Sequence, residues 1–237
     1  MASIRTLLAL AVVVTSCSPA AQNSPSLSQS EPSTSSSTAD ILCGKNEGEC
    51  LKQLASLATR DGDQLRLKLT NGQTKTFTTM RRACEANIYD KCLQYRLMGY
   101  FTRHSQFLVD VGYLNHGGIT LLVSSQTGNH IRLDATPHYS PSGKRIAAVS
   151  ASEAEDHAAN SIQIWSTTSD PPKSEWRYTV PKGEYALYEF VGWDGDERLK
   201  MTVTTRIGQG PLQSLPVEAV RTNNGWKLMP TALNELN

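Results

Sequence analysis

The sequence lacks a charge excess of either sign, a long apolar run and the common catalytic signatures. Its 23 Lys and Arg residues nearly balance its 22 Asp and Glu residues, so the net charge of +1 does not favour a nucleic-acid partner. The apolar run Leu7–Val14 is too short, at about 1.5 Å per residue, to cross a hydrocarbon core of about 30 Å. HExxH and G-x-S-x-G motifs are absent, and no Gly-rich phosphate loop follows a strand and opens a helix. The sequence therefore predicts no particular reaction.

The composition excludes a wholly disordered chain and favours one folded body. Hydrophobic residues make up 39% of the chain, and with the 16 glycines they reach the usual range of globular proteins. A chain of 237 residues is short for two domains, so a single domain is the default expectation.

The N-terminus has the layout of an export signal: a cation at Arg5, a short apolar stretch and then small residues. The four residues Val14-Thr15-Ser16-Cys17 resemble the lipobox of bacterial lipoproteins. This resemblance implies cleavage after residue 16 and a diacylglyceryl group on Cys17. Ser18 is similar to the residue that follows the cysteine in outer-membrane members, which implies an outer-membrane location facing the periplasm. The alternative is an ordinary secretory signal that contains a cysteine.

Residues 17–39 are expected to form a disordered linker after the lipidated cysteine. The stretch Ser18–Thr38 is rich in Ser, Thr and Pro and has one charged residue, Glu31. Such a segment buries too little apolar surface to offset its ordering entropy. Its root-mean-square reach is about 25 Å, enough to hold a folded body clear of lipid headgroups.

Residues 40–237 are expected to form a single β-rich domain that begins with one short helix. The spacing of Leu51, Leu54 and Ala58 predicts an amphipathic helix over 47–60. The pair Asn71-Gly72 lies between two alternating segments and predicts a hairpin with a type I′ turn. Further strands are predicted over 95–101, 107–113, 119–124, 130–133, 145–150, 161–166, 176–180, 186–191, 199–205, 217–222 and 226–229.

One stretch suggests how these strands are organised. Ser140-Pro141-Ser142-Gly143, followed by an aliphatic strand and a strand ending near Trp165, resembles the repeat of TolB-type and WD-like β-propellers, although Ser142 replaces the usual Asp. Weaker echoes occur over 107–133 and 190–203. The spacing of about 40–55 residues is near that of one four-stranded blade and allows about four blades. The predicted fold is all-β, a small or incomplete propeller-like body, with an unclosed stack of antiparallel meanders as the alternative.

Four cysteines follow Cys17, and an even number in an exported chain predicts disulfides. The local pairs Cys43–Cys50 and Cys84–Cys92 are preferred, and a bridge between the two regions is the competing arrangement. Their C-x6-C and C-x7-C spacings are wider than those of zinc sites, so no metal is predicted.

Two short motifs are better explained as turns than as catalytic or metal sites. Asn115-His116-Gly117-Gly118 is similar to the oxyanion loop of esterases, but no nucleophile elbow accompanies it. A calcium loop needs oxygen ligands spread over about twelve residues, but Asp194-Gly195-Asp196-Glu197 is followed at once by Arg198 and Leu199. The motif therefore predicts a turn between two strands.

The sequence leaves three functional hypotheses. The first is a lipid-anchored, non-enzymatic binding or scaffold module of the bacterial envelope, bound to the membrane by its lipid and to an envelope protein partner, with no nucleic acid and no cofactor. The second is an envelope hydrolase whose active-site residues meet only in space, and the third is a purely structural envelope protein. The candidate residues of the hydrolase are His116, Asp110, Asp134 and Ser140.

Overall fold

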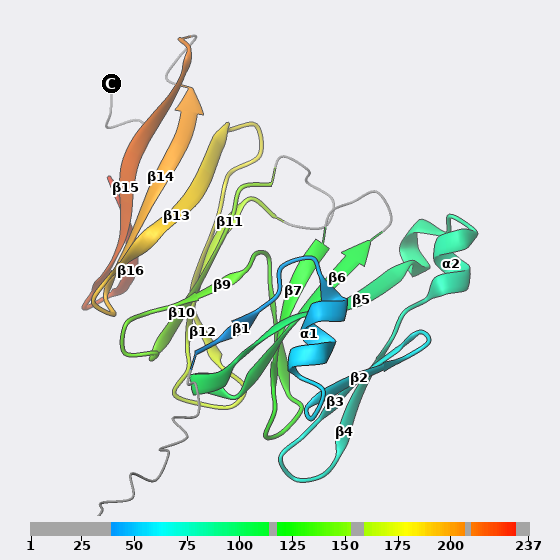
Figure 1. The fold of residues 1–237 in the computed structure, drawn as a ribbon. Coiled ribbons are helices and arrows are strands. Elements are labelled where there is room, and N and C mark those ends of the chain that lie inside the picture. The colour runs from blue at the N-terminus through cyan, green and yellow to red at the C-terminus, as the bar shows by residue number, and fades with distance from the viewer. Residues whose placement is uncertain (1–38, 114–117, 153–158, 207–209, 231–237) are drawn as a thin grey trace, which may run out of the picture. The chain divides into compact units, whose positions relative to one another are not determined.

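A computed structural model describes residues 39–113, 118–152, 159–206 and 210–230 (Figure 1). The chain divides into the units Met1–Ser37 and Thr38–Asn237, and the structure described below belongs to the second. The proposed lipobox, Cys17 and the linker lie outside the described residues except for Ala39, and so does His116.

The fold is mostly β, as predicted, and consists of four open antiparallel sheets. Three of them contain a run of four consecutive strands, and we call these the first, second and third meanders. The first contains β5 (Leu93–Phe101), β6 (Gln106–Tyr113), β7 (Gly118–Ser124) and β8 (His130–Leu133), with β1 (Ile41–Leu42) beside β5. The second contains β9 (Pro137–Tyr139), β10 (Arg145–Ser150), β11 (Ser161–Ser166) and β12 (Lys173–Thr179). The third contains β13 (Ala186–Asp194), β14 (Arg198–Arg206), β15 (Leu212–Thr222) and β16 (Gly225–Met229).

The fourth sheet lies near the N-terminus and contains β2 (Ala58–Asp61), β3 (Gln64–Lys68) and β4 (Thr74–Thr78). It packs with α1 (Glu47–Gln53) against one face of the first meander, in a core that includes Leu54, Leu65 and Phe107. The other face of the first meander packs on the second meander through Leu122 and Ile146. The expected number of about four blade-sized units is therefore not reached, because residues 40–92 form this smaller sheet and short helices instead.

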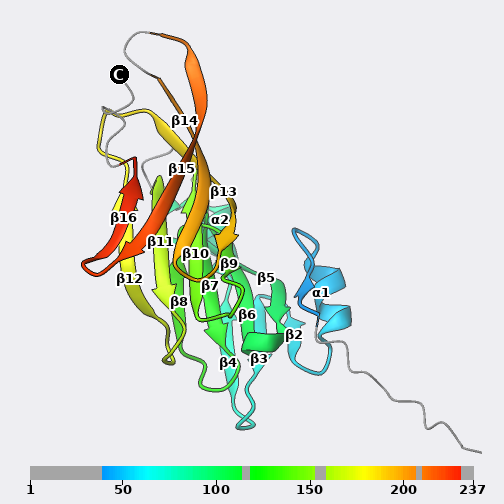
Figure 2. The ribbon, with the colours of Figure 1, turned by 90° about the vertical axis from the view of Figure 1, so that its left-hand side faces the viewer.

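The burial of the strands follows from this layering (Figure 2). The second meander is covered on both faces, since Ile146 contacts the first meander and Ala147 contacts the third. Four consecutive residues are accordingly buried in β10 and again in β11. In β14, by contrast, buried and more exposed residues alternate, because only one face of the third meander is covered.

The first helix is shorter than predicted. Asn46 begins α1 by accepting a hydrogen bond from the Glu49 amide at 3.2 Å, but the helix ends at Gln53 and Ala58 belongs to β2. Ala58 is buried in the same core as Leu54, so the apolar pattern is satisfied by a helix followed by a strand. The single predicted helix is also an undercount, because the structure adds α2 (Arg81–Glu85) and the 3-10 turns η1 (Tyr89–Lys91) and η2 (Thr102–His104).

The hairpin at Asn71-Gly72 is confirmed, but the prediction of a type I′ turn was wrong. Gly72 has a φ of +83°, whereas Asn71 is not among the residues with positive φ, so the turn is not type I′. The Gly72 amide donates to the carbonyl of Leu69 at 3.0 Å, and the Leu69 amide donates to the Gln73 carbonyl at 2.8 Å. This is the three-residue loop in which a type I turn precedes a left-handed residue.

Both preferred disulfides are present. Cys43 is bonded to Cys50 and Cys84 to Cys92, so each bridge closes a short local loop. The competing prediction, a disulfide that joins the Cys43/Cys50 region to the Cys84/Cys92 region, was wrong.

Candidate binding site

The connections between the strands of the three meanders lie at two opposite ends of the stack. The described chain begins at one of them, where the Thr102 amide donates to the Asp40 carboxylate at 3.0 Å and the Thr102 hydroxyl donates to the Ala39 carbonyl at 2.9 Å. We call this the proximal end. It carries the turns 102–105, 140–144 and 194–198, each of which joins the first two strands of one meander.

Equivalent turns of neighbouring meanders contact one another at the proximal end. The His104 ring stacks on Tyr139, with 3.6 Å between ring centroids, and a Cβ placed on Gly143 would lie 2.4 Å from His104 Cε1. The hydroxyl of Ser142 donates to the Asp196 carboxylate at 2.5 Å. These contacts join the first meander to the second and the second to the third, so the proximal turns form one connected layer.

The Ser142-Asp196 contact also stabilises the turn 140–144. Ser142 Oγ accepts a hydrogen bond from the Lys144 amide at 3.2 Å and donates to the carboxylate of Asp196 in the third meander. The hydrogen bonds from the Ser142 and Ser140 hydroxyls hold the pKa of Asp196 below its ordinary value. Asp196 therefore stabilises a neighbouring turn, and its role was not visible in the local sequence.

A charged network also crosses the contact between the second and third meanders, which we call the seam. Arg145 Nε donates to Glu175 at 2.8 Å, its Nη1 donates to the Asp196 carbonyl at 3.1 Å, and its guanidinium lies 5.6 Å from the Trp226 ring centroid. The Trp226 indole also donates to Glu175 at 2.9 Å. Partial burial would raise the pKa of Glu175, but the hydrogen bonds from Arg145 and Trp226 outweigh it and lower the pKa. The proximal end is thus closed by its own polar contacts.

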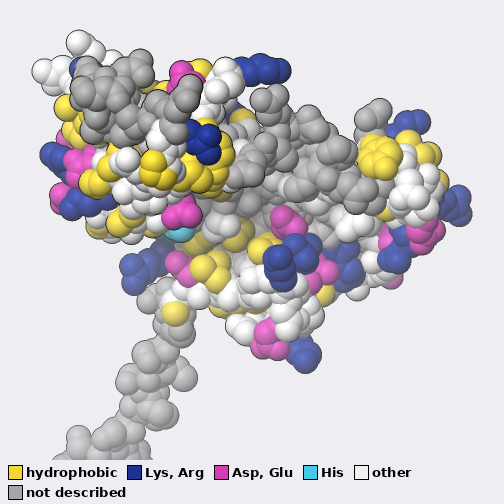
Figure 3. Space-filling model, turned by 90° about the horizontal axis from the view of Figure 1, so that it is seen from above, with side chains coloured by type: hydrophobic (Ala, Val, Ile, Leu, Met, Phe, Trp, Pro, Cys, Tyr) yellow, Lys and Arg dark blue, Asp and Glu magenta, His cyan; other side chains and the backbone are white. Residues whose placement is uncertain are grey.

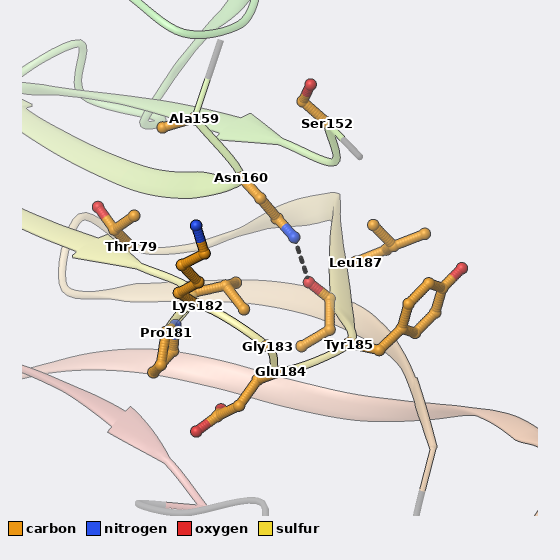
Figure 4. A pocket seen from close by; sticks show the side chains of 12 residues that line it. Ser152, Ala159, Asn160, Thr179, Pro181, Lys182, Gly183, Glu184, Tyr185 and Leu187 are labelled. Carbon is orange, nitrogen blue, oxygen red and sulfur yellow. Dashed lines mark hydrogen bonds between the residues drawn. The ribbon is translucent and has the colours of Figure 1, made fainter. Parts of the chain in front are cut away.

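The opposite, distal end carries a pocket of about 340 Å³ between the second and third meanders (Figure 4). Its walls are the connection 180–185, which joins β12 to β13, and Ser152, Ala159 and Asn160 from the connection between β10 and β11. Asn160 Nδ2 donates to the Ala186 carbonyl at 2.6 Å and so ties the two walls together.

The pocket offers polar groups of several kinds. Lys182, Glu184 and Tyr185 come from the connection 180–185, and Thr179 from the end of β12. The Tyr185 side chain is exposed to 41% at the rim. These side chains can bind a ligand reversibly through hydrogen bonds and ring contact. Sequence reasoning missed this site, because Pro181 and Gly183 indicate a connection but not the end at which it lies.

The structure does not bring together the residues predicted for a hydrolase. Asp110 pairs with Arg96 at 2.7 Å, whereas Ser140 Oγ accepts from the Arg145 amide at 3.1 Å. Asp134 is buried and accepts from Arg177 and from the Ser161 hydroxyl, both at 2.6 Å. The fourth candidate, His116, lies outside the described residues.

The three histidines within the described segments pack against aromatic rings. His104 stacks on Tyr139, His138 stacks on Phe190 at 3.8 Å between centroids, and His130 meets the ring of Phe77 edge-on. Burial lowers the pKa of all three, which favours the neutral imidazole. His104 and His138 are half-buried packed side chains, whereas His130 is exposed beside Phe77.

Comparisons with known proteins assign no class to this fold and site: no family model matches the chain, no curated protein matches its sequence, and no solved structure matches its fold. In the described part of the chain no helix is long and apolar enough to cross a membrane. Within the same residues no group of three or more His, Cys, Asp or Glu side chains is placed to hold a metal ion.

Proposed function

We propose that the protein is a lipid-anchored bacterial envelope protein whose body is a non-enzymatic binding module. Cys17 carries the lipid, residues 17–39 act as the linker, and the distal end of the body binds an envelope protein partner. We propose the inner side of the outer membrane as its location. The two disulfides are consistent with an oxidising, extracytoplasmic compartment.

The body is proposed to be related to β-propellers, as a short array of blade-like meanders that does not close. Three consecutive four-stranded meanders support this relation, since strand order follows the sequence in each. The contacts between equivalent turns, His104 with Gly143 and Ser142 with Asp196, give further support, because neighbouring blades of a propeller repeat one packing arrangement.

The observation that carries the proposed binding role is the difference between the two ends. The proximal turns are engaged with one another, and the chain enters there at Ala39 and Asp40. The pocket lies at the distal end, on connections that a rigid stack of sheets presents.

The anchor is tested by metabolic labelling with palmitate in a Gram-negative host. Label is expected in the wild-type protein and not in Cys17→Ala, because the lipobox thiol is the proposed acceptor. Label retained by Cys17→Ala would refute the anchor.

The distal binding role is tested by site-specific photo-crosslinking in the same cells. A photoreactive phenylalanine at Tyr185 replaces one ring by another at the pocket rim, and Asn224, in the exposed proximal turn between β15 and β16, is the matched control. We expect a discrete protein adduct from position 185 and none from position 224. Adducts of equal yield from both positions, or none from 185, would contradict a distal binding site.

A further inference from the structure

A second cavity lies on the other side of the first meander from the pocket. It has a volume of about 640 Å³ and opens between the N-terminal sheet, the start of α1, α2 and the strands β5 and β6. We call it the charged cleft. Its charged lining consists of three arginines and four carboxylates: Arg60, Arg81, Arg96, Glu47, Asp63, Asp110 and Glu85.

Six of these groups form three ion pairs inside the charged cleft. Arg60 contacts Glu47 at 2.6 Å, and Arg96 contacts Asp110 and Arg81 contacts Asp63, both at 2.7 Å. In Figure 3, basic and acidic side chains lie interleaved over the right-hand part of the molecule, where α2 lies. Charges of both signs therefore border one cavity, so an ion of a single sign meets repulsion as well as attraction.

The arginines in this cleft use only part of their hydrogen-bonding capacity. Arg60 contacts both Glu47 and the Tyr95 carbonyl through Nη2, and Arg96 contacts Asp110 through Nη2. The Nε atoms of Arg60 and Arg96 are buried and have no hydrogen-bond partner among the described residues. A guanidinium can bind a carboxylate through two parallel N–H groups, so a small rotation of either side chain would let a ligand carboxylate use these groups.

Both disulfides hold the walls of the charged cleft. Cys43–Cys50 closes the loop that carries Glu47, whose carboxylate also accepts from the Leu97 amide at 2.8 Å. Cys84, itself a lining residue, is bonded to Cys92 and closes the loop that runs from the end of α2 through η1. Walls fixed in this way lose little conformational entropy when a ligand binds.

We propose that the charged cleft binds a short peptide or amino-acid derivative that carries both an ammonium and a carboxylate group. Arg60 and Arg96 receive the ligand carboxylate, and Asp110 and Glu85 receive its ammonium. A zwitterion can place opposite charges against both kinds of wall, which a simple anion or cation cannot do. This site is separate from the distal pocket and does not depend on the lipid anchor.

The inference is tested by isothermal titration calorimetry of the purified, oxidised protein. The zwitterionic probe is the dipeptide lysylglutamate, and glutarate and 1,5-diaminopentane supply single-sign probes of similar length. We expect saturable, one-site binding of the dipeptide that is at least about tenfold tighter than that of either control. Equal affinity for a single-sign probe, or no binding of the dipeptide, would overturn the inference.

Variants locate the binding site. Arg96→Gln and Asp110→Asn are each expected to weaken dipeptide binding about tenfold. Glu85→Gln serves if either variant fails to fold, since Glu85 is an exposed residue of the cleft that is assigned to the ligand ammonium and can be replaced without disturbing the core. The matched control is Arg198→Gln, which removes an exposed ion pair with Glu218 on the third meander and should leave the affinity unchanged. Unchanged affinity in the folded cleft variants, or an equal loss in Arg198→Gln, refutes the assignment.

Discussion

The seam between the second and third meanders should depend strongly on Arg145. Its side chain is 9% exposed and that of its partner Glu175 is 21% exposed, so the pair is largely shielded from water. Arg145→Ala removes the ion pair, the hydrogen bond to the Asp196 carbonyl and the contact with the Trp226 ring. Glu175 keeps only the indole donor. Leaving a shielded charge without its counter-ion destabilises a protein by about 3–5 kcal/mol.

The matched comparison for this prediction is Arg198→Ala. Arg198 pairs with Glu218 at 2.5 Å, but the two side chains are 44% and 33% exposed, so solvent screens the interaction and the expected loss is below about 1 kcal/mol. Urea unfolding with both disulfides intact, followed by tryptophan fluorescence, measures both free energies of unfolding. Similar losses in the two variants would refute the argument that shielding from water makes the Arg145 pair important.

Further predictions concern the proximal turns and the sulfur bridges. Gly143→Ala should destabilise the fold by about 2–4 kcal/mol in urea unfolding, because the residue has a φ of +73° and a new Cβ would meet His104. Gly195→Ala, at an equivalent turn with a φ of +61° but no atom within 4 Å, should lose only about 1–2 kcal/mol, and equal losses would contradict the contact with His104. The folded state lowers the pKa of Glu175, so the stability it contributes is present above its ordinary pKa of 4.5 and lost as the pH falls through the folded pKa. The stability difference between wild type and Glu175→Gln should therefore shrink below pH 4.5 in acid titrations of unfolding, and a constant difference would count against this role. Non-reducing peptide mapping should recover two local disulfide-linked loops, and free thiols or a cross-linked pair of loops would contradict the structure.

The strands of the second meander show what local sequence can predict. The predicted ranges Arg145–Ser150 and Ser161–Ser166 coincide with β10 and β11, because each is an apolar run bounded by turn residues. The three-residue strand β9 was not predicted, since so short a segment has no measurable period. The helix expected over 47–60 failed because the same apolar spacing also fits a helix followed by a strand.

The arrangement of the sheets and the candidate sites depend on contacts between distant residues. Ser142 and Asp196 are 54 positions apart, and Glu47 reaches the Leu97 amide across 50 positions. No periodicity or motif encodes such a pairing. The disulfides were predictable because both bridges are local. That the two disulfide-closed loops border one cavity could not be predicted, because it depends on how distant segments pack in the fold.

The uneven covering of the three meanders limits how this architecture could lose or gain a whole sheet. Loss of the third meander would expose Ala147, Ile162 and Ile164 to water and leave an apolar surface prone to aggregation. A further sheet packed on β14 would have to bury the charges of Arg198 and Lys200, which is costly unless they are paired. Removal of the third meander, or packing of another sheet on its outer face, would therefore require compensating changes on the surface concerned.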